Sequence, residues 1–267
     1  MTMTKRITFA ERYQSVLVPV IFEPWARELI RRARPQSGEH ILDLACGTGV
    51  VTKEIAKQVP EPCRLSAADH SPDMLYVARS LARKAGFEVE WVEADAAVLP
   101  FADNSFDLAI CQQALQFFPD KLGALRELRR VLKPGGRAVF CVQREMAVNP
   151  MLQAQAAALE AHVGAEAAAA VHAICSLPDS SELRDLFEAA GFRGIELESV
   201  SLELEHPDAA AFAAGAMGGM HTGDKLAGLP DGAIDRAVQA FLTGLGDYLE
   251  ARSLRFPHVS NVVVATA

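Results

Sequence analysis

Apolar and polar positions alternate in blocks along the chain. Apolar runs of strand length lie at 40–45, 64–69, 88–93, 107–111 and 137–142. Segments with the helical spacing of apolar residues fall between these runs. An alternation of strands and helices predicts βαβ units, and therefore a parallel sheet with helices on both faces.

Helix boundaries are marked by local signals in this alternating region. The helix expected at 71–85 has Ser71 as its N-cap, Pro72 at its first helical position and Gly86 just past its end. A helix expected at 120–132 runs into the turn signal KPGG before the next strand.

The N-terminal part and the C-terminal half depart from this rhythm. Residues 10–34 look helical but contain Pro19 and Pro24, which predicts two short helices with a break between them. After residue 143, an alanine-rich helical segment is followed by a capped helix in which Asp179 and Glu182 have capping-box spacing and Gly191 is the stop. The remaining expected elements are a long strand at 194–205, a helical stretch at 207–250 and a final strand near 259–266.

Composition narrows the class of protein. The 267 residues are 50% hydrophobic and 22% charged, with a net charge of −8, which is typical of a soluble globular chain. This acidic balance argues against a nucleic-acid partner, and no basic run is available to hold an anionic membrane. We expect no signal peptide or membrane span, and a cytoplasmic protein whose five cysteines are reduced. The seven histidines have no ligand spacing, so we expect no metal site.

The segment ILDLACGTGV, residues 41–50, joins a buried strand to a glycine loop. Gly47 and Gly49 let a ligand approach the backbone at the N-terminus of the next helix. Dinucleotides and S-adenosylmethionine both use such a loop. Thr52 stands where a dinucleotide-binding loop prefers a third small residue, and a pyrophosphate would sit badly near Asp43. The sulfonium and α-ammonium of S-adenosylmethionine would be attracted there, so Asp43 is expected to hold the ammonium directly or through water.

Two further carboxylates follow the next two strands. Asp69 ends the second strand, where a carboxylate can accept both ribose hydroxyls, although NAD binders use the same device. Asp95 follows the third strand and can accept the adenine amine. Met74, after the second strand, offers an apolar wall for the adenine ring.

Several motifs together carry a resemblance to a known family. ILDLACGTG matches its first motif, AADHSPDML its second, EADAAVLPFADNSFDLAICQQALQFFPD its third and fourth, and LRELRRVLKPGGR the helix and turn that follow. Over 37–142 the chain resembles a class I S-adenosylmethionine-dependent methyltransferase, and it is similar to the bacterial group with ubiquinone/menaquinone-type and small-molecule enzymes. Ala45 stands where many members have glycine, from which we expect a tighter loop without loss of binding.

The resemblance implies an α/β fold with a Rossmann-like, seven-stranded, mostly parallel sheet of order 3-2-1-4-5-7-6. Only the last strand would be antiparallel, helices would cover both faces with a helical lid, and the ligand would lie beyond the carboxyl ends of the strands. We expect one methyltransferase domain over 1–267. Its expected parts are an N-terminal helical cap (1–36), a cofactor-binding core (37–145), substrate-side helices and lid (146–206 and 207–250) and the last strand (251–267).

Site residues follow from the residue patterns and the resemblance together. The expected cofactor-binding residues are Asp43, Ala45, Gly47, Gly49, Asp69, His70, Met74, Asp95, Ala96 and Gln112. The expected substrate-binding residues are Tyr13, Gln116, Arg144, Phe212, Met217 and Met220. The candidates for a catalytic role are His221, Tyr13 and Gln113, each with the alternative of a surface or packing role.

Residues 207–250 form a long stretch between the last two strands of the expected sheet. Their segment AAAFAAGAMGGMHTG has an apolar face followed by a glycine-flanked turn, which suits a segment that moves. We expect Phe212, Met217 and Met220 to roof the acceptor pocket, with the region of Tyr13 as the opposite flap. The alternative is an extra packing layer or a dimer contact.

These observations predict an enzyme that transfers a methyl group from S-adenosylmethionine to an O, N or C atom of a small-molecule acceptor of secondary metabolism. Because the sulfonium is already activated, direct displacement needs mainly alignment and a dry site. The alternatives left open are an NAD(P)-dependent Rossmann enzyme and a non-catalytic S-adenosylmethionine-binding protein. The expected partner is the small-molecule acceptor, without nucleic acid or membrane, and the chain is expected to be a monomer or homodimer.

Overall fold

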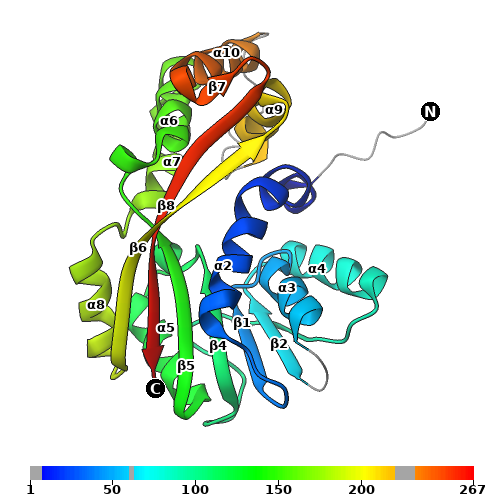
Figure 1. The fold of residues 1–267 in the computed structure, drawn as a ribbon, viewed down its shortest axis with the longest axis vertical. Helices are drawn as coiled ribbons and strands as arrows, with labels where there is room; N and C mark the ends of the chain where they lie inside the picture. Colours follow the sequence, from blue (N-terminus) through cyan, green and yellow to red (C-terminus); the bar gives the residue numbers. More distant parts are fainter. Residues whose placement is uncertain (1–7, 60–62, 220–231) are drawn as a thin grey trace. The chain divides into compact units, whose positions relative to one another are not determined.

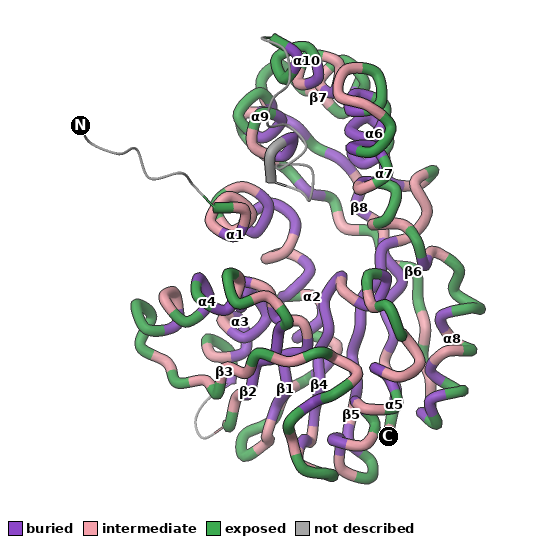
Figure 2. The backbone as a smooth tube through the Cα atoms, turned by 180° about the vertical axis from the view of Figure 1, so that it is seen from behind, coloured by how far each residue is buried: buried purple, intermediate pink, exposed green. Residues whose placement is uncertain are grey.

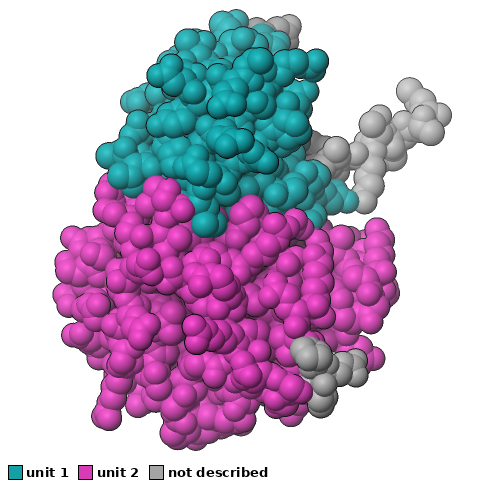
Figure 3. All heavy atoms as spheres, in the orientation of Figure 1, with its two compact units in different colours: residues 1–22, 146–174, 202–258 teal, residues 23–145, 175–201, 259–267 magenta. Residues whose placement is uncertain are grey.

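The computed structural model describes residues 8–59, 63–219 and 232–267 (Figure 1). The chain forms two compact units, each assembled from three separate stretches (Figure 3). Unit 1 comprises Met1–Phe22, Met146–Ile174 and Leu202–His258, and unit 2 comprises Glu23–Glu145, Cys175–Ser201 and Val259–Ala267. The expected single domain stays a prediction.

An open sheet with the strand order β3-β2-β1-β4-β5-β8-β6 runs through unit 2. The pairs β1–β2, β2–β3, β1–β4 and β4–β5 are all parallel, in keeping with strands that are apolar on both faces. These five strands are β1 His40–Leu44, β2 Arg64–Asp69, β3 Glu90–Glu93, β4 Phe106–Gln112 and β5 Leu132–Gln143.

The remaining strands complete the expected order. β6 spans Arg193–His206 and β8 spans Ser253–Thr266, and β8 pairs antiparallel with β5. The two-residue strand β7, Leu249–Glu250, pairs with β8 outside the main path of the sheet. With β7 set aside, the order 3-2-1-4-5-7-6 is confirmed, and the fold is the expected Rossmann-like one.

The helices of unit 2 begin and end at the predicted signals. Ser71 caps α4 by accepting the N–H of Met74 at 3.3 Å, and Gly86 ends that helix with left-handed backbone. Asp179 caps α8 by accepting backbone N–H groups of its first turn. The helices are α2 Glu23–Ala33, α3 Val50–Gln58, α4 Pro72–Ala85, α5 Lys121–Val131 and α8 Ser180–Ala189, with the short 3₁₀ helix η2 at Leu115–Phe117.

Both faces of the central strands are buried. On one face, Leu42, Leu44 and Phe140 belong to an apolar cluster that includes side chains of α5 and α8. Neighbouring residues in a strand point to opposite faces, and Ile41 and Val139 on the other face are equally buried. The helix α2 contacts β4 and β5. Figure 2 accordingly shows the central strands in the buried colour along most of their length.

The N-terminal helices differ from the expectation of a break at the prolines. Helical structure continues from α1, Phe9–Arg12, through a π-helix at Tyr13–Phe22 into α2. Pro19 lies inside the π-helix. A proline ring clashes with the carbonyl four residues earlier in an α-helix, and the wider π-helical turn changes that contact, so the helix is altered in type and is not interrupted.

Unit 1 is mostly helical and closely packed. A Cβ on Gly215 of α9 would lie 2.6 Å from the side chain of Val16, so only glycine allows this approach. Buried Gln155 of α6 donates to the carbonyl of Ala216 at 3.3 Å. Besides α1 and the π-helix, the helices are α6 Pro150–His162, α7 Ala165–His172, α9 Ala209–Gly219 and α10 Ala233–Leu245, with short 3₁₀ helices at Met146–Val148, Ala173–Cys175 and Gly246–Tyr248.

Two strands are longer than expected. β8 begins at Ser253, not near 259, because Leu254 and Phe256 are buried while Arg255 between them is exposed, which is the alternation of a strand. In β5, the KPGG segment is looped out between two paired positions, since Phe106 pairs with Leu132 and Leu108 with Arg137. Within the described residues, no helix is long and apolar enough to cross a membrane.

Candidate active site

The loop between β1 and α3 has a backbone that favours glycine. Gly47 has a φ of +55° and Gly49 a φ of +80°. A Cβ on Gly49 would lie 3.0 Å from Cη2 of Trp91 and 3.4 Å from Cβ of Ala78, so a side chain there would be both strained and crowded. Ala45 adopts the same left-handed region, with a φ of +55°. The loop therefore presents nearly bare backbone at the carboxyl end of β1.

Asp43 caps the helix that follows this loop. Gly49 is the N-cap of α3 and has no side chain with which to accept a hydrogen bond. The Oδ2 atom of Asp43 instead accepts the backbone N–H of Thr52 at 2.9 Å and its hydroxyl at 2.5 Å. A carboxylate in the buried strand thus satisfies one of the free N–H groups at the helix start.

Burial makes the charge of Asp43 easy to remove. The residue is 2% exposed. Burial raises the pKa of Asp43 to about 7, the hydrogen bonds from Thr52 oppose that shift, and the carboxylate of Asp69 adds to it. A cation at this edge of the sheet would favour the ionised form, as the expected ammonium contact requires.

Asp69 links the glycine loop to the end of β2. Its Oδ2 accepts the N–H of Gly47 at 2.8 Å, and its Oδ1 accepts the N–H of Ser71 at 2.8 Å. Each carboxylate oxygen has a further lone pair, so the two ribose hydroxyls can still be accepted. His70 is exposed, with Nδ1 3.6 Å from Oδ1 of Asp69.

Asp95 lies in the turn that follows β3, the strand next to β2 in the sheet. The N–H of Ala94 donates to the carbonyl of Asp69 at 3.0 Å, which ties the ends of β2 and β3 together. Asp95 is exposed, and its Oδ1 accepts the N–H of Ala97 at 2.8 Å. Met74 lies in the first turn of α4 and is partly buried, as is Ala96 in the Asp95 turn. The structure therefore brings the acidic residues expected for the cofactor to one edge of the sheet.

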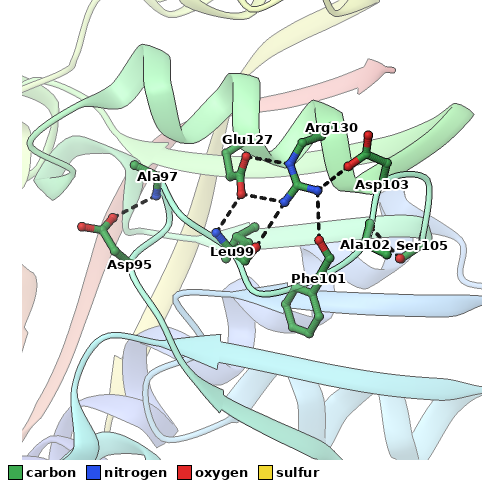
Figure 4. Close-up of polar contacts among 9 residues, drawn as sticks. All are labelled: Asp95, Ala97, Leu99, Phe101, Ala102, Asp103, Ser105, Glu127 and Arg130. Carbon is green, nitrogen blue, oxygen red and sulfur yellow. Dashed lines mark hydrogen bonds and ion pairs between the residues drawn. The ribbon is translucent and has the colours of Figure 1, made fainter.

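Arg130 of α5 anchors the loop between β3 and β4 (Figure 4). Its guanidinium donates to the carbonyls of Leu99 at 3.1 Å and Phe101 at 2.9 Å, and it pairs with Glu127 at 2.7 Å. Glu127 also accepts the N–H of Leu99 at 2.8 Å. The hydrogen bond from Arg130 lowers the pKa of Glu127, so the carboxylate stays charged and the loop stays fixed.

Three glutamines lie in or just after the carboxyl end of β4. Gln112 ends the strand, and Gln113 has a φ of +53°, which is strained for a residue other than glycine. The Nε2 atom of Gln113 donates to Ser260 of β8 at 2.7 Å, and its buried Oε1 has no partner among the described residues. Gln116 is 3% exposed, and both atoms of its amide are buried without a partner there.

Arg144, expected to meet a substrate, is already engaged at the end of β5. Its guanidinium pairs with Glu145 at 2.7 Å and donates to the hydroxyl of Ser199 at 2.9 Å. Its role toward a substrate stays a prediction.

The expected lid residues fall in unit 1. Phe212 and Met217 are each 1% exposed. The ring of Tyr13 lies 4.8 Å from that of Phe22, measured between centroids. Met220 and His221 lie outside the described residues. The roles of all these side chains toward an acceptor stay predictions.

One buried hydroxyl indicates that the glycine loop is built for a ligand. Thr48 lies between Gly47 and Gly49, is 3% exposed, and its Oγ1 has no hydrogen-bond partner among the described residues. Buried hydroxyls are normally paired. The α-carboxylate of S-adenosylmethionine could accept this hydroxyl and its α-ammonium could be attracted by Asp43, so the residues present fit that cofactor.

Several functional contacts were not expected from the sequence. Thr52 and Ser260 are hydrogen-bond partners of the expected site residues Asp43 and Gln113, Glu127 and Arg130 hold the loop after β3, and Thr48 has a buried hydroxyl without a partner among the described residues. The i,i+3 spacing of Glu127 and Arg130 is a sequence signal for an ion pair on a helix. Their contacts with the distant loop have no such signal in the sequence. For metals, no suitable group of His, Cys, Asp or Glu side chains occurs among the described residues.

A glycine loop, an acid at the end of β2 and a further acid after β3 lie at the carboxyl edge of a sheet of this order, as expected for an S-adenosylmethionine-dependent methyltransferase. Residues 11–204 match the ubiE/COQ5 methyltransferase family. The chain belongs to this family. It is 33% identical over 189 residues to the ubiquinone/menaquinone biosynthesis C-methyltransferase UbiE of Klebsiella pneumoniae. The matched region covers 66% of this chain and 75% of that relative.

Solved structures show the same fold. A Bacillus halodurans protein described as a candidate methyltransferase has a TM-score of 0.61 at 21% identity, covering 90% of this chain and 97% of that one. A Haemonchus contortus phosphoethanolamine N-methyltransferase has a TM-score of 0.58 at 19% identity, covering 91% and 52%. The family identifies this chain as an enzyme that transfers a methyl group from S-adenosylmethionine to a small-molecule acceptor. The NAD(P)-dependent alternative is thereby set aside.

Proposed function

We propose that the chain methylates a ring carbon of a small, uncharged acceptor of secondary metabolism by direct displacement. The curated relatives are named C-methyltransferases, which supports carbon as the receiving atom. The observation that carries the proposal is the glycine loop, in which the buried hydroxyl of Thr48 has no partner among the described residues and the N–H of the adjoining Gly47 donates to Asp69.

Each part of the cofactor has a proposed holder. Asp43, Ala45, Gly47 and Gly49 would surround the methionine part, together with the backbone at Gln112. Asp69 and His70 would bind the ribose. Met74, Asp95 and Ala96 would bind the adenine. These assignments are supported by the common edge of the sheet on which all these residues lie.

The chemistry requires little acid–base help. In the proposed step the ring carbon attacks the methyl group, the carbon–sulfur bond breaks and its electron pair stays on sulfur. The proton on the attacked carbon then leaves to water. Because the leaving group is a neutral thioether, the main demands are alignment and a dry site. Tyr13, Gln113 and His221 remain candidates for a role at this step.

The proposal includes a cytoplasmic monomer or homodimer without nucleic-acid or membrane partners. The net charge of −8 supports the exclusion of polyanions. Light scattering would measure the oligomeric state, and a binding titration with a mixed DNA and anionic-vesicle panel would test the excluded partners. Retention on either surface at physiological salt would contradict this part.

The test uses S-adenosylmethionine labelled with ¹³C in its methyl group. The protein is incubated with a panel of hydroxylated ring compounds and, separately, with simple amines. The ¹³C chemical shift of the product distinguishes carbon, oxygen and nitrogen methylation. A new carbon-bound methyl signal is expected. An oxygen- or nitrogen-bound signal would contradict carbon as the acceptor atom, and intact S-adenosylmethionine with every ring compound would contradict a ring compound as the acceptor.

A further inference from the structure

Three buried amide atoms at the carboxyl end of β4 have no hydrogen-bond partner within the described part of the chain. Neither Nε2 nor Oε1 of Gln116 has a hydrogen-bond partner among the described residues, although the residue is 3% exposed. The Oε1 atom of Gln113 is also buried without a partner among the described residues, and Gln113 is 9% exposed. Buried polar groups are normally paired, so these atoms need a partner that the described part of the chain does not supply.

The backbone that carries these side chains is firmly held. The N–H of Gln113 donates to the carbonyl of Cys141 at 3.0 Å, and the hydroxyl of Ser176 donates to the carbonyl of Gln116 at 3.1 Å. The Nε2 atom of Gln113 is also oriented by Ser260. The unpaired amide atoms are therefore presented by a fixed segment, in the manner of a prepared binding site.

We infer that Gln113 and Gln116 bind the methyl acceptor through an uncharged edge on which a ring hydroxyl stands beside a ring carbonyl. This rests on the proposed function, because it takes the acceptor to lie beyond the carboxyl end of β4. A primary amide presents an N–H donor beside a C=O acceptor. The amide of Gln116 can therefore pair with the carbonyl and the hydroxyl of such an edge at once, while Oε1 of Gln113 accepts a second hydroxyl.

The charges nearby favour a neutral acceptor. The glutamine amides carry no charge, and the guanidinium of Arg144 at the adjacent strand end is paired with Glu145 at 2.7 Å. An acceptor carboxylate would have to compete with that ion pair. A neutral hydroxyl and carbonyl need no counter-charge, and a ring carbon next to such a hydroxyl is electron-rich, as methyl transfer to carbon requires.

The probe is maltol, which has a hydroxyl beside a ring carbonyl, and the matched control is its O-methyl ether, which lacks the donor. Both are titrated into the complex with S-adenosylhomocysteine. We expect the wild type to bind maltol about tenfold more tightly than the ether, the effect of about one good hydrogen bond. Gln116→Met should lose this discrimination while S-adenosylhomocysteine binds as before. Equal binding of maltol and ether by the wild type, or full discrimination in Gln116→Met, would overturn the inference.

Thermal unfolding without acceptor provides a second readout. Gln116→Met replaces an unpaired buried amide with an apolar side chain of similar shape, so it should raise the melting temperature. Asn261→Leu is the control, because the amide of Asn261 donates to the carbonyl of Pro178 at 2.9 Å and its loss should lower that temperature. A lowered melting temperature for Gln116→Met would indicate a structural role and overturn the inference.

A second variant guards against a protein that does not fold. Gln116→Leu loses both the donor and the acceptor without burying a charge, and it should bind maltol about tenfold more weakly than the wild type. Unchanged maltol binding in Gln116→Leu would overturn the inference. Failure of the proposed function would look different: the protein would bind S-adenosylhomocysteine and discriminate maltol from its ether, yet would form no carbon-bound methyl product with any ring compound.

Discussion

One carboxylate oxygen of Asp43 accepts two hydrogen bonds from Thr52, from its N–H at 2.9 Å and from its hydroxyl at 2.5 Å. The same carboxylate is proposed to attract the ammonium of the cofactor. Capping the helix requires only a hydrogen-bond acceptor, whereas attracting a cation requires a charge. Because burial raises the pKa of Asp43 to about 7, the second role depends on pH and the first does not.

Stability of the cofactor-free protein should fall as pH rises. The folded protein holds the Asp43 proton up to about pH 7, whereas the ordinary pKa of an aspartate is 3.8. The stabilising contribution is therefore complete below about pH 4 and lost as pH rises through about 7. Asp43→Asn should match the wild type near pH 4 and exceed its unfolding free energy by about 1–3 kcal/mol near pH 8. Urea unfolding at both pH values measures this; an equal gain at both would exclude the titration as the cause.

Binding of S-adenosylmethionine should release a proton. The cationic ligand favours ionised Asp43, so about half a proton per site should leave near pH 7. Calorimetry in two buffers of different ionisation enthalpy measures the release. Thr52→Val removes one hydrogen bond that lowers the pKa, so it should move the release to higher pH. A binding enthalpy that is independent of the buffer would contradict the role of Asp43.

Asp69→Ala should weaken S-adenosylmethionine binding by about 1.5–3 kcal/mol, because charge-assisted hydrogen bonds to the ribose would be lost. The matched variant Asp69→Asn keeps one acceptor oxygen, which can still receive the N–H of Gly47 or of Ser71, and it should lose less affinity. Calorimetry with S-adenosylhomocysteine compares the two. An unchanged affinity in Asp69→Ala would rule out the ribose contact.

The substitutions Ala45→Gly and Gly49→Ala should change the stability of the protein in opposite directions. Ala45→Gly removes a side chain from a left-handed position and should stabilise the protein by about 0.5–1 kcal/mol. Gly49→Ala places a Cβ 3.0 Å from Trp91 at a φ of +80° and should destabilise it by about 1–3 kcal/mol. Chemical denaturation measures both. If Ala45→Gly were destabilising, the strain assigned to that position would be absent.

Arg130→Met should loosen the loop between β3 and β4. The variant leaves the carbonyls of Leu99 and Phe101 without their donor, so amide hydrogen exchange should accelerate in that loop and S-adenosylhomocysteine affinity should fall about threefold to tenfold through the displaced Asp95 turn. The control is Arg129→Met on the same helix, whose side chain donates to the carbonyl of Gly191. Equal exchange rates in the two variants would show that Arg130 does not hold the loop.

The elements that could be predicted from the sequence are those with local signals. Ser71 and Gly86 mark the ends of α4 correctly because capping depends on a few adjacent residues. The strand order came from the family resemblance, since pairing between distant strands leaves no local pattern. The start of β8 was not predicted because the alternation at Leu254, Arg255 and Phe256 covers only three residues and follows the two-residue strand β7 and a turn.

The site was predictable in its chemistry more than in its contacts. The sequence places Asp43, Asp69 and Asp95 in or just after three successive strands, and the structure brings them to one edge of the sheet, while their roles toward the cofactor stay predictions. The contact between Asp43 and Thr52 could not be predicted, because it depends on how the loop between these two residues turns. The π-helix at Tyr13–Phe22 could not be predicted either. Pro19 is a signal for a helix break, and a π-helix has no sequence signature that would distinguish it.

The place of β8 in the sheet has a consequence for how the protein is made. β8 is the last strand in the sequence, yet it lies between β5 and β6. As the chain emerges from the ribosome, β5 exposes the backbone groups that Val262, Val263 and Val264 of β8 will later pair. Such an apolar, half-finished edge can recruit other nascent chains. The yield of folded protein in a cell should therefore depend on how fast translation delivers the final strand, and on chaperones that shield β5 until it arrives.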